Sequence, residues 1–388
     1  MQEITEQDLA GWRANLDRLV AESSTVFRRV EVRQRFGRVL AGFLGTAERK
    51  NGWQLAEAIG ENEPHGVQRL LAEAVWDADT LRDVLRRYVV AQLGAPDGVL
   101  VIDESGFLKK GTHSVGVARQ YTGTAGKIEN CQVGVFLTYA SARGHAFLDR
   151  ALYLPAAWAE DRERLTAAGV PASVAFATKP ELARRMVAEA IAADVPHSWV
   201  VGDSGYGDDG ALRGDLEGRG EAYALGVSSH HGIWEGGEHR TVREDVATWP
   251  ATAWTRLSAG RGSQGERLYD WAWLQLVGPD ARGLAAWLVA RRTFGHEPEE
   301  LAYFRVFGPA ATVLPTIAQV IGTRWTIEEC LEEAKGLAGL DQYEVRHWVP
   351  WQRHVTLALL AHAVLAVSRS PGPDADPEKG GPTQRGAG

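Results

Sequence analysis

An unbroken apolar run over residues 99–102, Val-Leu-Val-Ile, ends abruptly in the carboxylate of Asp103. Four consecutive β-forming residues are typical of a strand buried on both faces, because a half-exposed strand would alternate apolar with polar residues. We therefore expect Asp103 to lie where a central strand opens into a loop. In an open α/β sheet this is the usual position for a residue of the functional site.

The chain repeats this pattern at residues 199–202, where a second apolar segment leads into Asp203. Alternating and helical periodicities predict the surrounding elements: strands over 132–139 and 145–154, a helix over 179–193, and then a helix over 210–219 and a strand over 222–227. This α/β order is that of the ribonuclease H-like arrangement. In that fold the first and fourth strands are neighbours, which would bring both aspartates to one end of the sheet.

Composition shifts divide the 388 residues further. Helical periodicity dominates the beginning of the chain, short tryptophan-containing strands follow residue 227, and a long helix is expected over 316–336 and an apolar helix over 355–368. We therefore predict a helical domain over 1–95, an α/β core formed by 96–227 and 315–370, a β-rich insertion over 228–314, and a disordered tail over 371–388.

The charge of the chain is unevenly distributed. A net charge of −8 argues mildly against a nucleic-acid partner. Residues 27–50, however, contain seven basic side chains against two acidic ones, Glu31 and Glu48: Arg28, Arg29, Arg33, Arg35, Arg38, Arg49 and Lys50. On its own this segment fits a solvated helix surface as well as a DNA-binding face.

The composition also excludes several classes of protein. Two distant cysteines, Cys131 and Cys330, provide neither a zinc knuckle nor a disulfide framework, so a metal would need oxygen or histidine ligands. The sequence has no apolar segment of membrane-spanning length and does not begin with a signal sequence, which predicts a cytoplasmic protein without a membrane partner.

A third acid completes a candidate site. Arg324, Glu328 and Lys335 share one face of a predicted helix, and a carboxylate between two cations suits a phosphate-bearing ligand. Carboxylates also suit Mg²⁺, and a pair of ions can promote in-line displacement at a phosphodiester. Each acid alone has an ordinary alternative: a strand-ending aspartate is often a cap, and Glu328 lies among other glutamates in a pattern typical of intrahelical salt bridges.

Four segments together resemble bacterial DDE transposases, and within them the insertion-sequence family numbered seven hundred and one. The segments are VIDESGFLKKG at 101–111, GKIENCQVG at 126–134, GDSGYG at 202–207 and RWTIEEC at 324–330. The resemblance implies that Asp103, Asp203 and Glu328 are the catalytic triad and bind two Mg²⁺ ions, for which Mn²⁺ would substitute. Glu104 is expected to point to the opposite side of the strand and at most to support this triad.

The resemblance also implies that the helical domain over 1–95 binds DNA and that the core formed by 96–227 and 315–370 is catalytic. Arg324 and Lys335 match the family's signature of tyrosine, arginine, glutamate and lysine, but Ile321 occupies the tyrosine position, so a DNA hairpin intermediate is not implied. The residues expected to bind DNA are Arg28, Arg29, Arg33, Arg35, Arg38, Lys109, Lys110, Arg324 and Lys335. Tryptophans of the insertion would either stack on an unpaired base or, for most of them, pack in the core.

The function implied is cleavage of phosphodiesters at transposon ends, followed by transfer of the freed 3′-hydroxyl into target DNA. The expected partners are double-stranded DNA with terminal inverted repeats, target DNA, and a second copy of the chain in a synaptic homodimer, with the protein associated with the nucleoid. Two alternatives stay open: a ribonuclease H-like nuclease without transposition, and a DNA-binding regulator derived from a transposase.

Overall fold

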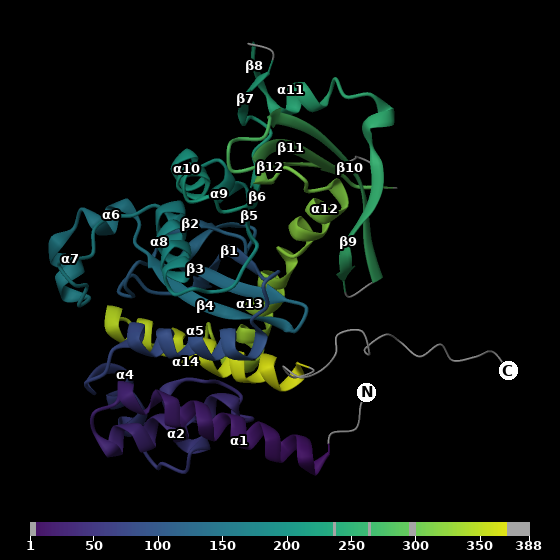
Figure 1. The fold of residues 1–388 in the computed structure, drawn as a ribbon. Helices are drawn as coiled ribbons and strands as arrows, with labels where there is room; N and C mark the ends of the chain where they lie inside the picture. Colours follow the sequence, from purple (N-terminus) through teal and green to yellow (C-terminus); the bar gives the residue numbers. More distant parts are fainter. Residues whose placement is uncertain (1–4, 236–237, 263–264, 295–299, 371–388) are drawn as a thin grey trace.

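A twisted, mixed sheet built from strands between residues 99 and 309 is the centre of the computed structural model, which describes residues 5–235, 238–262, 265–294 and 300–370 (Figure 1). Its ten strands follow the order β2-β3-β1-β5-β6-β12-β11-β10-β9, and β4 also pairs with β3. The strands nearest the candidate site are β1 (Val99–Leu108), β2 (Ala118–Thr122), β3 (Lys127–Ser141), β4 (Gly144–Tyr153), β5 (Trp199–Gly202) and β6 (Tyr223–Val227). This architecture is consistent with a ribonuclease H-like core.

The pairing of β1 confirms one prediction and corrects another. β1 runs parallel to β5 from the pair Val99 and Trp199 to the pair Ile102 and Gly202, so the first and fourth core strands are neighbours as expected. The expectation that the strand ends at Asp103 was wrong. β1 continues to Leu108, because its other neighbour β3 remains paired with it over that whole length.

The predicted helices at the start of the chain are present. They are α1 (Glu6–Glu22), α2 (Val30–Leu44), α4 (His65–Ala72) and α5 (Ala78–Leu93), together with two short elements that the periodicity did not reveal, η1 (Ser23–Val26) and α3 (Gly52–Ala58). Thr5 and Asp8 form the capping box of α1. Buried residues of these helices belong to the same hydrophobic core as the sheet. That they fold as an independent domain stays a prediction.

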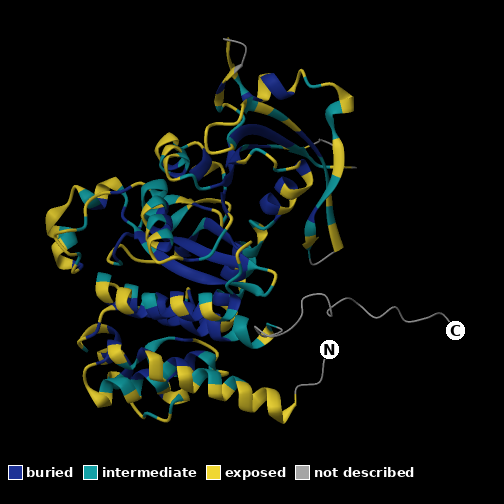
Figure 2. Cartoon of the chain, in the orientation of Figure 1, coloured by how far each residue is buried: buried dark blue, intermediate teal, exposed yellow. Residues whose placement is uncertain are grey.

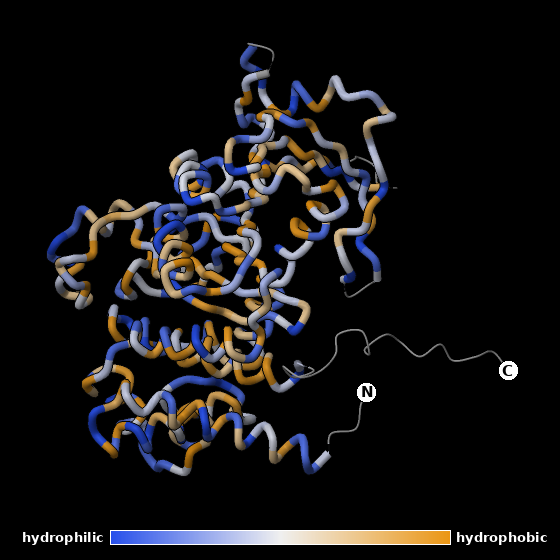
Figure 3. Tube along the Cα trace, in the orientation of Figure 1, coloured by the Kyte–Doolittle hydropathy of each residue, from blue (hydrophilic) through white to orange (hydrophobic). Residues whose placement is uncertain are grey.

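The last helix, α14 (Trp348–Arg369), lies between the sheet and the first helices (Figure 1). It begins seven residues before the predicted start and packs against α2, α4, α5 and β4. Arg353 donates hydrogen bonds to the carbonyl oxygens of Leu71, Ala74 and Trp76 at 3.0, 2.7 and 2.6 Å. Figure 3 shows apolar residues along this helix and along the central strands. The helix α14 therefore joins the first helices and the sheet, two regions that the sequence presents as separate.

The helix predicted over 316–336 is two helices, α12 (Leu314–Gly322) and α13 (Trp325–Ala338). The break has a packing cause. A Cβ on Gly322 would lie 2.0 Å from the carbonyl oxygen of Ala259, so the end of α12 rests directly on the backbone of β9. Arg267 donates to the Gly322 carbonyl at 3.0 Å, which satisfies a group that a continuous helix would have used.

The region after β6 is rich in strands, as predicted, and it extends the main sheet: β12 (Leu301–Pro309) pairs antiparallel with β6. Its other elements are β7 (Gly232–Glu235), β8 (Glu238–Thr241), α11 (Val242–Val246), η2 (Ala251–Ala253), β9 (Thr255–Gly262), β10 (Gly265–Val277) and β11 (Leu284–Arg292). Trp271 and Trp287 are buried and contribute to the core, whereas Trp234 is exposed. Figure 2 shows the buried residues continuing from the core strands into β11 and β12.

Four more helices connect the core strands: α6 (Ala156–Ala159), α7 (Arg162–Ala167), α8 (Lys179–Ala192) and α10 (Gly210–Arg219). The short helix α9 (Ser204–Gly207) directly follows β5. Within the described residues, no helix is long and apolar enough to cross a membrane. The tail predicted over 371–388 lies outside the described residues.

Candidate active site

Asp103 and Asp203 are the residues that directly follow the last parallel pair of β1 and β5, Ile102 and Gly202. The two aspartates therefore leave the parallel ladder at the same level of the sheet. Asp203 also caps α9, since its Oδ1 accepts a hydrogen bond from the backbone N–H of Gly205 at 2.9 Å. Strand pairing thus positions Asp103, and strand pairing with helix capping positions Asp203.

Close backbone contact holds α9 in place. A Cβ on Gly207 would lie 1.7 Å from the carbonyl oxygen of Gly226, and a Cβ on Gly226 would lie 3.1 Å from backbone atoms of Asp203 and Ser204. Glycine at position 207 is therefore required for α9 to rest on β6, and the space at Gly226 is tight for any larger residue. The orientation of Asp203 therefore depends on this contact between the two backbones.

The two aspartates share an unfavourable electrostatic environment. Burial, and next the charge of Asp203, raises the pKa of Asp103 to about 7, against the opposing effect of Arg324. Burial, and next the charge of Glu104, raises the pKa of Asp203. A pair of half-buried carboxylates that resists ionisation is an environment that a bound cation would stabilise.

Arg324 connects the third acid to the first. Its Nη1 lies 3.0 Å from Oδ2 of Asp103, and its Nη2 lies 2.5 Å from Oε1 of Glu328. Arg324 is the residue before α13, and Glu328 lies one turn along that helix. The structure therefore brings Asp103 and Glu328 to one guanidinium group, in a position where we had expected Arg324 to meet DNA.

The carboxylates suit a divalent cation by donor type, but they are not yet assembled around a common point. Among the residues that the structure describes, no group of three or more histidine, cysteine, aspartate or glutamate side chains lies close enough to hold a metal ion. Arg324 supplies the positive charge between Asp103 and Glu328. The donor types therefore fit a hard cation, and in this structure Arg324 lies between two of the three predicted acids.

Glu104 is closer to the site than the sequence suggested. Its Oε2 accepts a hydrogen bond from the hydroxyl of Tyr206 at 2.5 Å, and its Oε1 lies 2.6 Å from Nζ of Lys179. Alternation along β1 predicted the opposite side, yet its charge acts on Asp203. The sequence did contain one signal, the adjacent acids Asp103 and Glu104, but neither Tyr206 nor Lys179 was identifiable as a partner.

The predicted DNA-binding arginines differ in their availability. Arg28 and Arg29 are exposed before α2. Arg35 and Arg38 both pair with Glu61, at 3.2 and 3.1 Å, and Arg33 donates to the carbonyl oxygen of Phe27. The local excess of positive charge is therefore partly neutralised by an acid that lies outside residues 27–50.

The predicted lysines also divide. Lys110 is exposed, whereas Nζ of Lys109 lies 3.6 Å from the centre of the Tyr343 ring, and burial lowers the pKa of Lys109 to about 8. Lys335 lies beside Phe107 and donates to the hydroxyl of Thr124 at 3.3 Å. Assignment of these residues to DNA stays a prediction.

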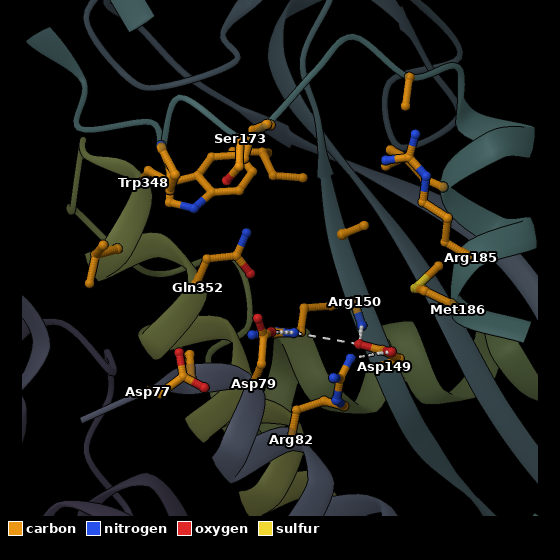
Figure 4. A pocket seen from close by; sticks show the side chains of 18 of the residues that line it. Asp77, Asp79, Arg82, Asp149, Arg150, Ser173, Arg185, Met186, Trp348 and Gln352 are labelled. Carbon is orange, nitrogen blue, oxygen red and sulfur yellow. Dashed lines mark hydrogen bonds and ion pairs between the residues drawn. The ribbon is translucent and has the colours of Figure 1, made fainter. Parts of the chain in front are cut away.

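A cavity of about 740 Å³ lies between α5, β4, α8 and the start of α14, and Asp103, Asp203 and Glu328 do not line it. Several of its charged groups pair with one another. Arg82 and Arg150 pair with the buried Asp149 at 2.5 and 3.4 Å, and Arg150 also pairs with Asp79. Figure 4 shows these four side chains and the contacts between them. We assign this network to the packing of α5 on the sheet.

Comparison with known proteins gives two findings. The profile of the family described as "DDE superfamily endonuclease" matches residues 24–248, which is more than half of the chain. A protein of Microchaete diplosiphon described as "Probable transposase for insertion sequence element IS701" is 31% identical over 170 residues. That alignment covers 44% of this chain and 42% of the relative.

Proposed function

Because the chain belongs to the family of DDE superfamily endonucleases, we propose that it is the transposase of an insertion sequence. It would cut phosphodiesters at the ends of its element and join the freed 3′-hydroxyl ends to target DNA. The similarity to the IS701 protein supports this function over part of both chains. Asp103, Asp203 and Glu328 would be the catalytic acids, on a ribonuclease H-like core.

The observation that carries this proposal is the pair of aspartates at the end of the β1 and β5 ladder. Their pKa values are raised by burial and by neighbouring carboxylates, which is the environment expected of acids that serve a cation. A regulator that only binds DNA would gain nothing from such acids, because the carboxylates would repel the phosphates of the DNA.

Members of this family use divalent metal ions, and here the ligands would be Asp103, Asp203 and Glu328, holding two Mg²⁺ ions or Mn²⁺ in their place. When bound, such a pair polarises the scissile phosphate and supplies a nucleophilic oxygen. Arg324 stabilises Asp103 and Glu328 as a charge partner in the DNA-free protein. Once a DNA phosphate attracts its guanidinium, those carboxylates become available.

The partners in this proposal are double-stranded DNA ending in terminal inverted repeats, target DNA and a second copy of the chain. Arg28 and Arg29, exposed near the start of α2, and Lys110, exposed after β1, are the best placed of the predicted DNA contacts. The family supports DNA as the substrate, and a homodimer would hold the two ends together during cleavage.

Cleavage of DNA bearing the element's ends, with Mg²⁺ or Mn²⁺, tests this function. The wild-type protein should cut and join. Asp103→Asn should bind the same DNA but cut it at least about 10³-fold more slowly, because the reaction depends on charge stabilisation at this acid. Cutting without joining by the wild type would support a nuclease. Binding without metal-dependent cutting would support a DNA-binding regulator and would overturn the proposal.

A further inference from the structure

Glu104 lies between the segments that carry the two aspartates. It follows Asp103 on β1, and its Oε2 accepts the hydrogen bond of Tyr206, which lies on α9 three residues after Asp203. The distance between the two oxygens is 2.5 Å. This hydrogen bond is a direct side-chain contact between β1, which carries Asp103, and α9, which Asp203 caps.

The two ends of this contact are fixed by their surroundings. Tyr206 is 1% exposed, and the glycine after it holds α9 against the backbone of β6. The other oxygen of Glu104 accepts a 2.6 Å contact from Lys179, which begins α8. Both carboxylate oxygens of Glu104 are therefore engaged, and its charge has a cation beside it.

We propose that Glu104 and Tyr206 are positioning residues for the cleavage reaction: their hydrogen bond fixes where Asp203 lies relative to Asp103. The inference rests on the proposed function of these aspartates. In this proposal Glu104 acts through Asp103 and Asp203, because Tyr206 and Lys179 bind its two oxygens and hold its side chain in place. Lys179 offsets the charge that would otherwise add to the repulsion among three neighbouring acids.

Tyr206→Phe isolates the hydrogen bond, because it removes only the hydroxyl. Tyr223→Phe is a matched control. Tyr223 is also buried, and its hydroxyl donates a hydrogen bond to Glu217 over the same distance of 2.5 Å. Tyr223 lies at the start of β6, away from Asp203. Both variants should lose similar stability in thermal melts. Only Tyr206→Phe should weaken Mn²⁺ binding to the complex with end-bearing DNA, by about tenfold in calorimetry or by electron paramagnetic resonance.

The kinetics should separate positioning from DNA binding. For Tyr206→Phe, kcat for cleavage should fall about tenfold while KM for DNA stays unchanged, since no DNA contact is removed. Glu104→Gln keeps an acceptor for Tyr206 and should retain more activity than Glu104→Ala. Mn²⁺ binding by Tyr206→Phe equal to that of Tyr223→Phe would overturn the inference, as would a Glu104→Gln variant as inactive as Asp103→Asn.

The Asp103→Asn protein separates the two possible failures. If Asp103→Asn binds Mn²⁺ as tightly as the wild type, the metal site lies elsewhere, and both the proposed function of Asp103 and the positioning role fail. If Asp103→Asn loses Mn²⁺ and Tyr206→Phe does not, the catalytic assignment stands and the positioning role alone is wrong.

Discussion

At the scale of single residues, Arg324 is the group whose environment differs most from expectation. The sequence placed it on a helix face toward a phosphate, but the structure places its guanidinium against Asp103 and Glu328, at 3.0 and 2.5 Å. Arg324 lies 221 residues from Asp103 in the sequence but only four residues from Glu328. Only the second contact could have been predicted from helical spacing.

Removing Arg324 should favour metal binding in the absence of DNA. In Arg324→Ala, Asp103 and Glu328 lose their internal cation, so Mn²⁺ should bind about tenfold tighter, equivalent to about 1.4 kcal/mol. Calorimetric titration of the DNA-free protein measures this. Arg256→Ala, which removes the arginine paired with Asp270 between β9 and β10, is the control and should leave Mn²⁺ affinity unchanged. Unchanged or weaker binding in Arg324→Ala would contradict this role.

At the scale of elements, the sequence predicted strands and helices better than their contacts. The apolar runs predicted β1 and β5, and helical periodicity predicted α1 and α8, because these signals are local. The continuation of β1 past Asp103 and the break between α12 and α13 depend on β3 and β9, whose positions local sequence does not encode. The contact of α9 with β6 likewise depends on a neighbouring element whose position the local sequence does not encode.

Gly207→Ala tests the contact of α9 with β6. The new methyl group would lie 1.7 Å from the carbonyl oxygen of Gly226, so α9 must move and take Asp203 with it. We expect a loss of about 1–3 kcal/mol in the free energy of unfolding, together with slower DNA cleavage.

Gly218→Ala is the control for this change. Its Cβ would meet no atom within 4 Å, and it lies inside α10. This substitution should stabilise the protein by up to about 1 kcal/mol, since alanine favours a helix over glycine. Equal stability and equal activity of the two alanine variants in urea unfolding and cleavage assays would show that α9 tolerates displacement.

At the scale of the whole molecule, the first helices and the sheet share one hydrophobic core around α14. His354 illustrates this continuity. It is 1% exposed, lies against Phe43 of α2 and Tyr343, and hydrogen-bonds the carbonyl oxygen of Gly339 after α13 at 3.1 Å. Composition marked a boundary near residue 95 but could not show that α14 returns to cover the helices before it.

Burial of His354 predicts acid sensitivity. Its pKa is lowered to about 4 in the folded protein, so between about pH 6.5 and pH 4 the unfolded chain binds a proton that the folded chain excludes. Stability should therefore fall with falling pH, by about 2 kcal/mol between pH 7 and pH 5 from this residue alone. Urea unfolding at the two pH values measures the effect.

His354→Gln should reduce this pH dependence, whereas His113→Gln, at an exposed position, should retain it. If the core is continuous, the helical circular dichroism signal and the intrinsic fluorescence of the tryptophans should report one unfolding transition. Two transitions would instead support a separately folding N-terminal domain, and an unchanged pH dependence in His354→Gln would contradict the account of His354.

The central claim is that Asp103, Asp203 and Glu328 form one metal site when DNA is bound, although Arg324 lies between two of them in the free protein. Anomalous diffraction from crystals of the protein with end-bearing DNA and Mn²⁺ tests this directly. We predict Mn²⁺ bound by oxygens of all three acids, with Arg324 moved to a DNA phosphate. Mn²⁺ bound by Glu329, Glu332 or Glu333, or Arg324 still paired with Asp103 and Glu328, would contradict the claim.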